Sequence, residues 1–243
     1  MKILVVGDPH GILSKKIPKK IDLILITGDI GKADLARKIA FENANRRRNG
    51  LPKLKKDKQL DKKIKAEINN STINVLRYLS KSAKVYSIAG NVGVPNSKKF
   101  NKNAKLIKNQ LRNLNGLRVG FLEYFVDNCW IKEFGEKDKK RIKKAQRETA
   151  RAKKVLEKFD NLDILLCHQP PFGYLDKVNF PGAPAHWKGK HAGSKVILDY
   201  IKKEQPRYVF CGHIHEAKGK TRIGKTEVYN VGSNGDYVLL NID

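Results

Sequence analysis

The stretch MKILVVGDPHG, residues 1–11, contains the pattern on which the fold assignment depends. Its apolar run at residues 3–6 is uninterrupted, which is typical of a strand buried on both faces of a sheet. The run leads into Gly-Asp-Pro-His-Gly, so Asp8 and His10 stand two residues apart directly after the strand. In extended backbone, side chains at positions i and i+2 point to the same side, so these two can converge. The stretch predicts a buried strand that carries side chains of metal-ligand type at its carboxyl end.

Further short apolar runs of the same kind predict more buried strands. They are residues 23–26, 85–89, 117–122, 164–167 and 208–210. Between them, apolar residues recur at helical spacing in residues 71–79 and 194–203. This alternation of strand and helix predicts an α/β fold with helices on the faces of a sheet.

The pattern changes after residue 210. Three short segments punctuated by glycine follow, at residues 220–223, 226–231 and 237–242. They predict an antiparallel meander that closes the fold.

Size and composition limit the class of protein. The chain has 243 residues, 40% of them hydrophobic, which suits a globular protein with a substantial core. The longest apolar runs are far too short to cross a bilayer, and the first residues predict a strand rather than a signal peptide. Three cysteines without CxxC spacing argue against a disulfide framework or a zinc ribbon. We therefore expect a cytoplasmic protein with no membrane segment; the sequence gives no indication of its oligomeric state.

The chain is strongly basic. It has 51 Lys and Arg against 24 Asp and Glu, a formal net charge of +27. Such a field attracts polyanions, so nucleic acid is a possible partner, although a lysine-rich genome or an unusual salt environment would leave the same composition. Two Lys/Arg-rich segments, residues 32–70 and 132–159, are interpreted as helical insertions in a single domain of residues 1–243. The second predicts an amphipathic helix with a basic outer face, and such charge runs are often only solvated helix faces.

Side chains of metal-ligand type follow five of the predicted strands. They are Asp8 and His10, then Asp29, then Asn91, then His168, and finally His213 and His215. In open α/β sheets, ligands collect beyond the carboxyl ends of the strands. A lone histidine or a single Gly-Asp turn carries little weight, but five such strand ends in one chain predict a common site. Mixed carboxylate and imidazole ligands suit Mn, Fe, Zn, Ni or Co better than Ca, and seven are about right for two metals that share a carboxylate.

The motifs GDPHG, TGD, GN, CH and GHIH, in this order, resemble the calcineurin-like metallophosphoesterases. The resemblance runs from Asp8 to the NVGS of residues 230–233. It implies a four-layer α-β-β-α sandwich of two mixed β-sheets flanked by helices, and two divalent transition metal ions. Manganese is the expected metal, with Fe, Zn, Ni or Co as alternatives. The same resemblance implies that one metal is held by Asp8, His10 and His215. Asp29 bridges to the second metal, which is completed by Asn91, His168 and His213.

One position departs from the family pattern. Most members have a histidine directly after Gly-Asn, where it assists the leaving group or the transition state, and this chain has Val92. The loss weakens the case for substrates with poor leaving groups, because general acid help is worth ~10²–10⁴-fold. His191, just before the helix predicted from Ser194, is the candidate catalytic replacement, although it could instead only position the start of that helix. His186 in the same loop is interpreted as an ordinary loop histidine.

These observations favour a phosphodiesterase acting on nucleotides or nucleic acid, through attack of a metal-bridging hydroxide on a phosphate ester. Aromatic residues that could stack bases are scarce in the basic segments; Phe41, Phe134 and Phe159 are those present. The alternatives are a phosphomonoesterase or protein phosphatase of the same fold, and a scaffold or nucleic-acid-binding protein with weakened catalysis. The presence of every ligand position argues against the scaffold.

Overall fold

The computed structural model describes residues 1–55, 57–92 and 100–242. Its strands form a five-stranded sheet, in the order β11-β1-β2-β3-β4, and a six-stranded sheet, in the order β5-β6-β7-β8-β10-β9. The first sheet contains β1 (Lys2–Val6), β2 (Leu23–Ile26), β3 (Lys84–Ser87), β4 (Ala104–Leu106) and β11 (Tyr237–Asn241). The second contains β5 (Gln110–Leu114), β6 (Leu117–Leu122), β7 (Ile164–Cys167), β8 (Tyr208–Cys211), β9 (Gly219–Ile223) and β10 (Thr226–Asn230).

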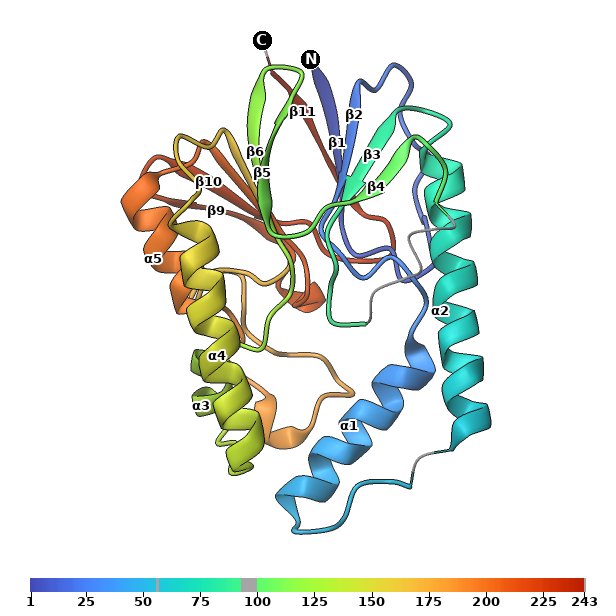
Figure 1. Cartoon of the computed structure of the whole chain (residues 1–243), viewed down its shortest axis with the longest axis vertical. Helices are drawn as coiled ribbons and strands as arrows, with labels where there is room; N and C mark the ends of the chain where they lie inside the picture. The colour runs from blue at the N-terminus through green and yellow to red at the C-terminus, as the bar shows by residue number, and fades with distance from the viewer. Residues whose placement is uncertain (56, 93–99, 243) are drawn as a thin grey trace.

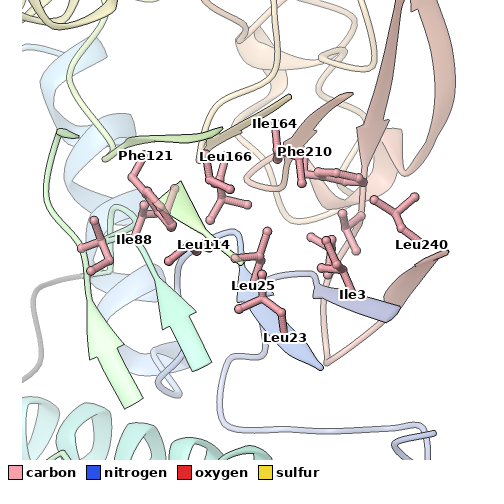
Figure 2. Close-up of a cluster of buried hydrophobic side chains, with 14 of the residues drawn as sticks. Ile3, Leu23, Leu25, Ile88, Leu114, Phe121, Ile164, Leu166, Phe210 and Leu240 are labelled. Carbon is pink, nitrogen blue, oxygen red and sulfur yellow. The ribbon is translucent and has the colours of Figure 1, made fainter. Parts of the chain in front are cut away.

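Apolar side chains of the two sheets pack against each other and form the central core. Because strand side chains alternate between faces, every second residue of the buried strands points into this layer. Figure 2 shows part of this cluster, with Ile3 and Leu25 from the first sheet and Phe121, Leu166 and Phe210 from the second, all of them 0% exposed. The hydrophobic pattern of the strands therefore determines how the sheets face each other.

The opposite faces of both sheets are covered by helices. Leu4 and Ile24 pack with Leu76 and Leu79 of α2 (Lys58–Leu79). On the other side, Leu165 lies in a cluster that includes residues of α4 (Lys139–Leu156) and α5 (Lys195–Glu204). Figure 1 shows α2 on one side of the molecule and α4 with α5 on the other. The predicted four-layer α-β-β-α fold is confirmed.

Parallel pairing places the carboxyl ends of the central strands at one edge. Strands β1 to β4 pair in parallel, as do β6 with β7, β7 with β8, and β8 with β10. The predicted strands at residues 23–26, 117–122 and 164–167 coincide with β2, β6 and β7. This edge is where the candidate ligands were expected.

The predicted C-terminal meander is wrong in one respect. Strands β9 and β10 form the expected antiparallel pair, but β11 leaves them and pairs with β1 in the other sheet. The crossing passes through Gly232 and Gly235, whose φ angles of 87° and 74° lie in the left-handed region that glycine adopts without strain. The segment pattern alone did not indicate which sheet would receive the last strand. Strands β4 and β5 were also not predicted.

Both basic segments are largely helical where they are described. The first contains α1 (Asp34–Arg48) and the start of α2; residue 56 lies outside the described part. Helix α3 (Asn128–Glu133) leads into the second, which contains α4. Ala145, Ala152 and Leu156 of α4 are buried, while most of its lysines and arginines are exposed. That the segments are insertions in a single domain stays a prediction. None of the helices in the described residues combines the length and apolar character needed to span a membrane.

The packing predicts how stability responds to truncation of the core. Replacing Leu25, fully buried between the sheets, by alanine should lower the free energy of unfolding by about 2–5 kcal/mol, because apolar contact is lost and a cavity remains. Denaturant titration measures this change. The matched control is Leu51→Ala, at a residue 50% exposed, where we expect a change within about 0.5 kcal/mol. Equal losses in the two variants would contradict this description of the core.

Candidate metal centre

The seven candidate ligands come from the carboxyl ends of strands in both sheets. Asp8 and His10 follow β1, Asp29 follows β2, and Asn91 follows β3; His168 follows β7, and His213 and His215 follow β8. The site therefore lies where the two sheets meet. Its position follows from the parallel order of the strands, because each of these strands ends at the same edge.

Asp8 is fully buried and is held from several directions. Its Oδ1 accepts a hydrogen bond from Thr27 Oγ1 at 2.6 Å, and its Oδ2 accepts one from the backbone N–H of His213 at 2.7 Å. Burial by itself would raise the pKa of Asp8, but the nearby imidazoles of His168, His215 and His10 hold that pKa well below its ordinary value. Asp8 is therefore an ionised carboxylate in the folded protein.

A first group of ligand atoms forms around His10. One ligand atom each from Asp8, His10 and His215 lie within 4.8 Å of one another. The Nε2 atoms of the two histidines are 3.4 Å apart, and His215 Nε2 is 3.2 Å from Asp8 Oδ2. Burial lowers the pKa of His10 to about 3, so its ring is neutral and offers a lone pair. These three side chains could hold one divalent cation.

A second group forms around His168, whose tautomer is determined by its surroundings. Its Nδ1 lies 3.0 Å from the carbonyl oxygen of Thr27 and must donate to it, so in the neutral ring the lone pair is on Nε2. That lone pair faces Asn91 Oδ1 at 2.9 Å and Asp29 Oδ2 at 3.5 Å. Acceptor atoms that face one another repel unless a proton or a metal ion lies between them. The arrangement therefore fits a metal cation.

Asn91 connects the second group to His213. The same Oδ1 atom of Asn91 lies 2.9 Å from His213 Nδ1. Burial lowers the pKa of His213 well below its ordinary value, which keeps the imidazole in its neutral, ligating form. Burial also raises the pKa of Asp29, opposed by His168, and a divalent cation beside this carboxylate would compensate for its desolvation. The structure thus brings all seven predicted side chains close together. Asp8 lies in both clusters of possible ligand atoms, with His10 and His215 in one and with Asp29 and His168 in the other.

The backbone of the site is tightly constrained. His10, Asp29 and His213 have φ angles of 47°, 36° and 66°, a region that non-glycine residues rarely adopt and that costs ~1–3 kcal/mol each. Two glycines approach the carboxylates closely: a Cβ on Gly90 would lie 2.1 Å from Asp29 Oδ1, and one on Gly212 would lie 2.4 Å from Asp8 Oδ1. The glycines of the motifs leave room for the carboxylates.

Val92 contributes its backbone to the centre. Its N–H donates to Asp29 Oδ1 at 2.9 Å, while its half-buried side chain is apolar. The rest of this loop, residues 93–99, lies outside the described residues. At the position where the family pattern has a histidine, the chain therefore supports Asp29 but offers no side-chain proton donor.

His191 and His186 lie apart from the ligand groups. His191 Nδ1 is 2.7 Å from Asp176 Oδ1 and its ring packs on Phe172, while His186 lies against Trp187. Within the described chain, none of the contacts of either histidine reaches the seven ligands. Asp176 also accepts hydrogen bonds from the N–H groups of residues 173 and 193, so His191 belongs to the framework of this loop. A catalytic role for His191 stays a prediction.

Three residues that sequence reasoning did not select also surround the centre. Thr27 forms hydrogen bonds with both Asp8 and His168. Its place in the TGD motif could have indicated this role from the sequence. Tyr124, just after β6, lies against the rings of His168 and His213 at 5.7 and 5.5 Å between centroids; burial raises its pKa, so the phenol stays protonated. Arg37 of α1 places Nη2 3.0 Å from His10 Nε2. Nothing in the sequence distinguished Arg37 from the other cations of its basic segment.

Comparisons with known proteins agree with this geometry. A family model described as metallophosphoesterase, calcineurin superfamily, matches residues 10–243. Metallophosphoesterase domain-containing protein 1 of Homo sapiens is 35% identical over 85 residues, which cover 33% of this chain and 24% of that protein. UPF0046 protein T07D4.2 of Caenorhabditis elegans is 33% identical over 86 residues, which cover 33% of this chain and 20% of that protein. The matched region thus spans about a quarter or less of these relatives.

Solved structures share the fold at low sequence identity. One aligns over 98% of this chain and 94% of its own, with a TM-score of 0.65 and 16% identity. The phosphopantetheinyl hydrolase of Mycobacterium tuberculosis aligns over 95% of this chain and 88% of its own, with a TM-score of 0.55 and 13% identity. At such identities the likeness supports the architecture alone.

The close approach of the glycines makes the centre testable without altering a ligand. Gly90→Ala and Gly212→Ala should each displace a carboxylate and weaken Mn²⁺ binding by at least ~10-fold, the usual effect of disturbing a ligand's support. Isothermal titration of metal-free protein with Mn²⁺ measures this affinity. Gly219→Ala is the matched control, since its new Cβ would lie 3.3 Å from the end of the Leu175 side chain and 4.0 Å from the carbonyl oxygen of Ala217. Unchanged Mn²⁺ affinity in both site variants would contradict the location of the centre.

Proposed function

The chain belongs to the calcineurin superfamily of metallophosphoesterases, and we propose that it is a metal-dependent hydrolase of phosphate esters that acts mainly on phosphodiesters. The observation that carries the proposal is the meeting of acceptor atoms around His168 and His10, which a pair of divalent cations would satisfy. Family membership and the ligand groups support divalent metals. We propose manganese first, with Fe, Zn, Ni or Co as alternatives that suit the same mixed ligands.

We assign the seven side chains to two ions as the resemblance to the family implies. Asp8, His10 and His215 would hold one, Asn91, His168 and His213 the other, and Asp29 would lie between them. When bound, such ions supply Lewis acidity to the phosphoryl group and lower the pKa of a water nucleophile. The remaining tasks fall to this chain's own residues.

Several residues orient the ligands and shape the site. Thr27 donates to the Asp8 carboxylate through its hydroxyl and accepts from His168 Nδ1 through its carbonyl oxygen, so it orients both side chains. Tyr124 covers the rings of His168 and His213 and limits the access of water to them. Val92 supports Asp29 through its N–H but brings no proton to the leaving oxygen. The site therefore suits esters whose leaving group departs without protonation.

The choice of a diester rests on charge. A net charge of +27 concentrates polyanions near the protein, and nucleic acid is the commonest polymeric diester. Helices α2 and α4 lie on opposite sides of the molecule, and α1, from the first basic segment, runs between them toward the lower end of α4 (Figure 1). Nucleic acid as the substrate, and a cytoplasmic location, stay predictions.

A phosphomonoesterase is the second candidate, and one observation favours it. Arg37 lies at the centre through its contact with His10, and a guanidinium can pair with the extra charge of a monoester dianion. Substrate comparison separates the two candidates.

The first test of function compares several substrates and includes a variant in which one candidate metal ligand is replaced. Protein loaded with Mn²⁺ should hydrolyse bis-p-nitrophenyl phosphate faster than p-nitrophenyl phosphate, with labelled RNA and DNA assayed in parallel. Asp29→Asn should reduce turnover by at least ~100-fold, because a ligand should matter no less than the groups that support it. Asp199→Asn, at an exposed residue of α5, is the control and should leave turnover unchanged. Monoester turnover alone would favour the second candidate, and no turnover at full metal occupancy would overturn both.

A second test concerns the leaving group. Val92→His should raise turnover of a dinucleotide, whose leaving oxygen needs a proton, by up to ~10²-fold, with little effect on p-nitrophenyl esters. If His191 acts as the general acid, His191→Ala should lower dinucleotide turnover alone. A loss of both activities together with a lower melting temperature would instead indicate that His191 only maintains its loop. If neither variant changes turnover, the assignment of this loop to the leaving group is wrong.

A further inference from the structure

Helix α1 runs away from the candidate metal centre, and one of its faces is turned toward the rest of the protein. Arg37, Phe41 and Ala44 follow one another at spacings of four and three residues, which places them on the same side of the helix. Arg37 contacts His10 at the centre. Ala44, about two turns further along, is buried. This face of α1 therefore points inward, with Arg37 at its inner end.

Contacts other than Arg37 determine the position of α1. Phe41 packs against Phe180 and Trp187, with ring centroids 6.1 and 5.8 Å apart. Arg47, near the other end of the helix, lies 3.7 Å from Glu136, which precedes α4. Figure 1 shows α1 running from the sheet edge toward the lower ends of α3 and α4. Because these contacts hold the helix, the placement of Arg37 does not depend on its own hydrogen bond.

Arg37 carries more hydrogen-bonding capacity than its surroundings use. Its guanidinium has five N–H donors, and Nη2 donates to His10 Nε2 at 3.0 Å. Among the residues that the structure describes, no carboxylate forms an ion pair with it. Its half-buried side chain therefore directs a permanent positive charge at a centre where phosphoryl oxygens would bind.

His10 Nε2 links Arg37 to metal binding. The same lone pair faces His215 Nε2 at 3.4 Å and belongs to the first ligand group. One lone pair cannot accept the Arg37 hydrogen bond and coordinate a metal ion at the same time. A metal on His10 would therefore free the guanidinium to contact oxygen atoms of a bound phosphate ester.

We propose that Arg37 is a catalytic residue that binds the phosphoryl group and stabilises the charge on the leaving oxygen, in place of the proton donor that Val92 cannot provide. The inference rests on the proposed hydrolase function. In the reaction, the oxygen of water bonds to phosphorus, the bond to the leaving oxygen breaks, and that oxygen departs with its electron pair. The water loses its proton to solvent, and Arg37 transfers none, because a guanidinium stays protonated in proteins.

This role defines a class of substrate. A residue that stabilises negative charge but donates no proton lowers the barrier most where most charge develops on the leaving oxygen, yet it leaves an unprotonated alkoxide a poor leaving group. The site should therefore prefer esters or anhydrides whose leaving group is an aryl oxide or a phosphate over those that release an alkoxide. Turnover should fall more steeply with leaving-group pKa in the absence of Arg37.

The test uses Arg37→Met and Arg37→Lys, with Arg48→Met as the matched control at an exposed residue on the same helix. Titration of the metal-free proteins with Mn²⁺ should show at least ~10-fold tighter binding in Arg37→Met, because a charge-assisted hydrogen bond no longer competes for His10. Inorganic phosphate should inhibit the loaded Arg37→Met enzyme at least ~10-fold more weakly. Across aryl methyl phosphates of rising leaving-group pKa, kcat should fall more steeply in Arg37→Met than in the wild type. Arg37→Lys should recover part of each effect.

The outcomes separate this inference from the proposed function. If Asp29→Asn abolishes turnover but Arg37→Met has the metal affinity, phosphate inhibition and leaving-group dependence of Arg48→Met, the hydrolase stands and the role of Arg37 is overturned. If the wild type has no turnover, the Mn²⁺ titration still decides whether Arg37 competes at His10. A lower melting temperature for Arg37→Met with unchanged Mn²⁺ affinity would indicate a structural role and would also overturn the proposal.

Discussion

The carboxylate of Asp8 joins the two sheets at the edge where the candidate metal centre lies. It belongs to the first sheet, where Thr27 donates to one of its oxygens, and its other oxygen accepts the N–H of His213 from the second sheet. His168 of the second sheet donates in turn to the carbonyl oxygen of Thr27. A charge this deeply buried is tolerated only because each oxygen has a partner. The ligands of both groups are arranged around this link, so the relative position of the sheets and the geometry of the centre depend on each other.

The parts of the fold that sequence could predict are those with one dominant physical signal. Residues 23–26 and 164–167 are uninterrupted apolar runs, and such runs indicate strands buried on both faces. The seven candidate ligands were predicted to lie close together because the carboxyl ends of parallel strands meet at one edge of a sheet. Strand β11 was assigned to the wrong sheet because its glycine-punctuated approach is compatible with either, and its choice depends on pairing with β1 far away in the chain.

The surroundings of the centre were harder to predict than its ligands. Arg37 is one of many cations in a basic segment, and its contact with His10 depends on how α1 packs across the molecule rather than on a local pattern. His191 has the chemistry of a general acid, but its pairing with Asp176 comes from the closure of a long loop. Sequence motifs report residues whose chemistry repeats across a family, whereas these contacts are determined by tertiary packing specific to the chain.

Two features of the structure affect folding during synthesis. Strand β11 pairs with β1, and the candidate ligands extend along the chain from Asp8 to His215. Asp8 and His215 contact each other across 207 positions of sequence. During synthesis, Asp8 leaves the ribosome long before His215, and β1 lacks its antiparallel neighbour until residues 237–241 have emerged. Pairings this distant in sequence form slowly. A nascent chain would offer divalent ions only scattered, weak ligands, so a metal bound by these residues would be acquired only once the two sheets have come together.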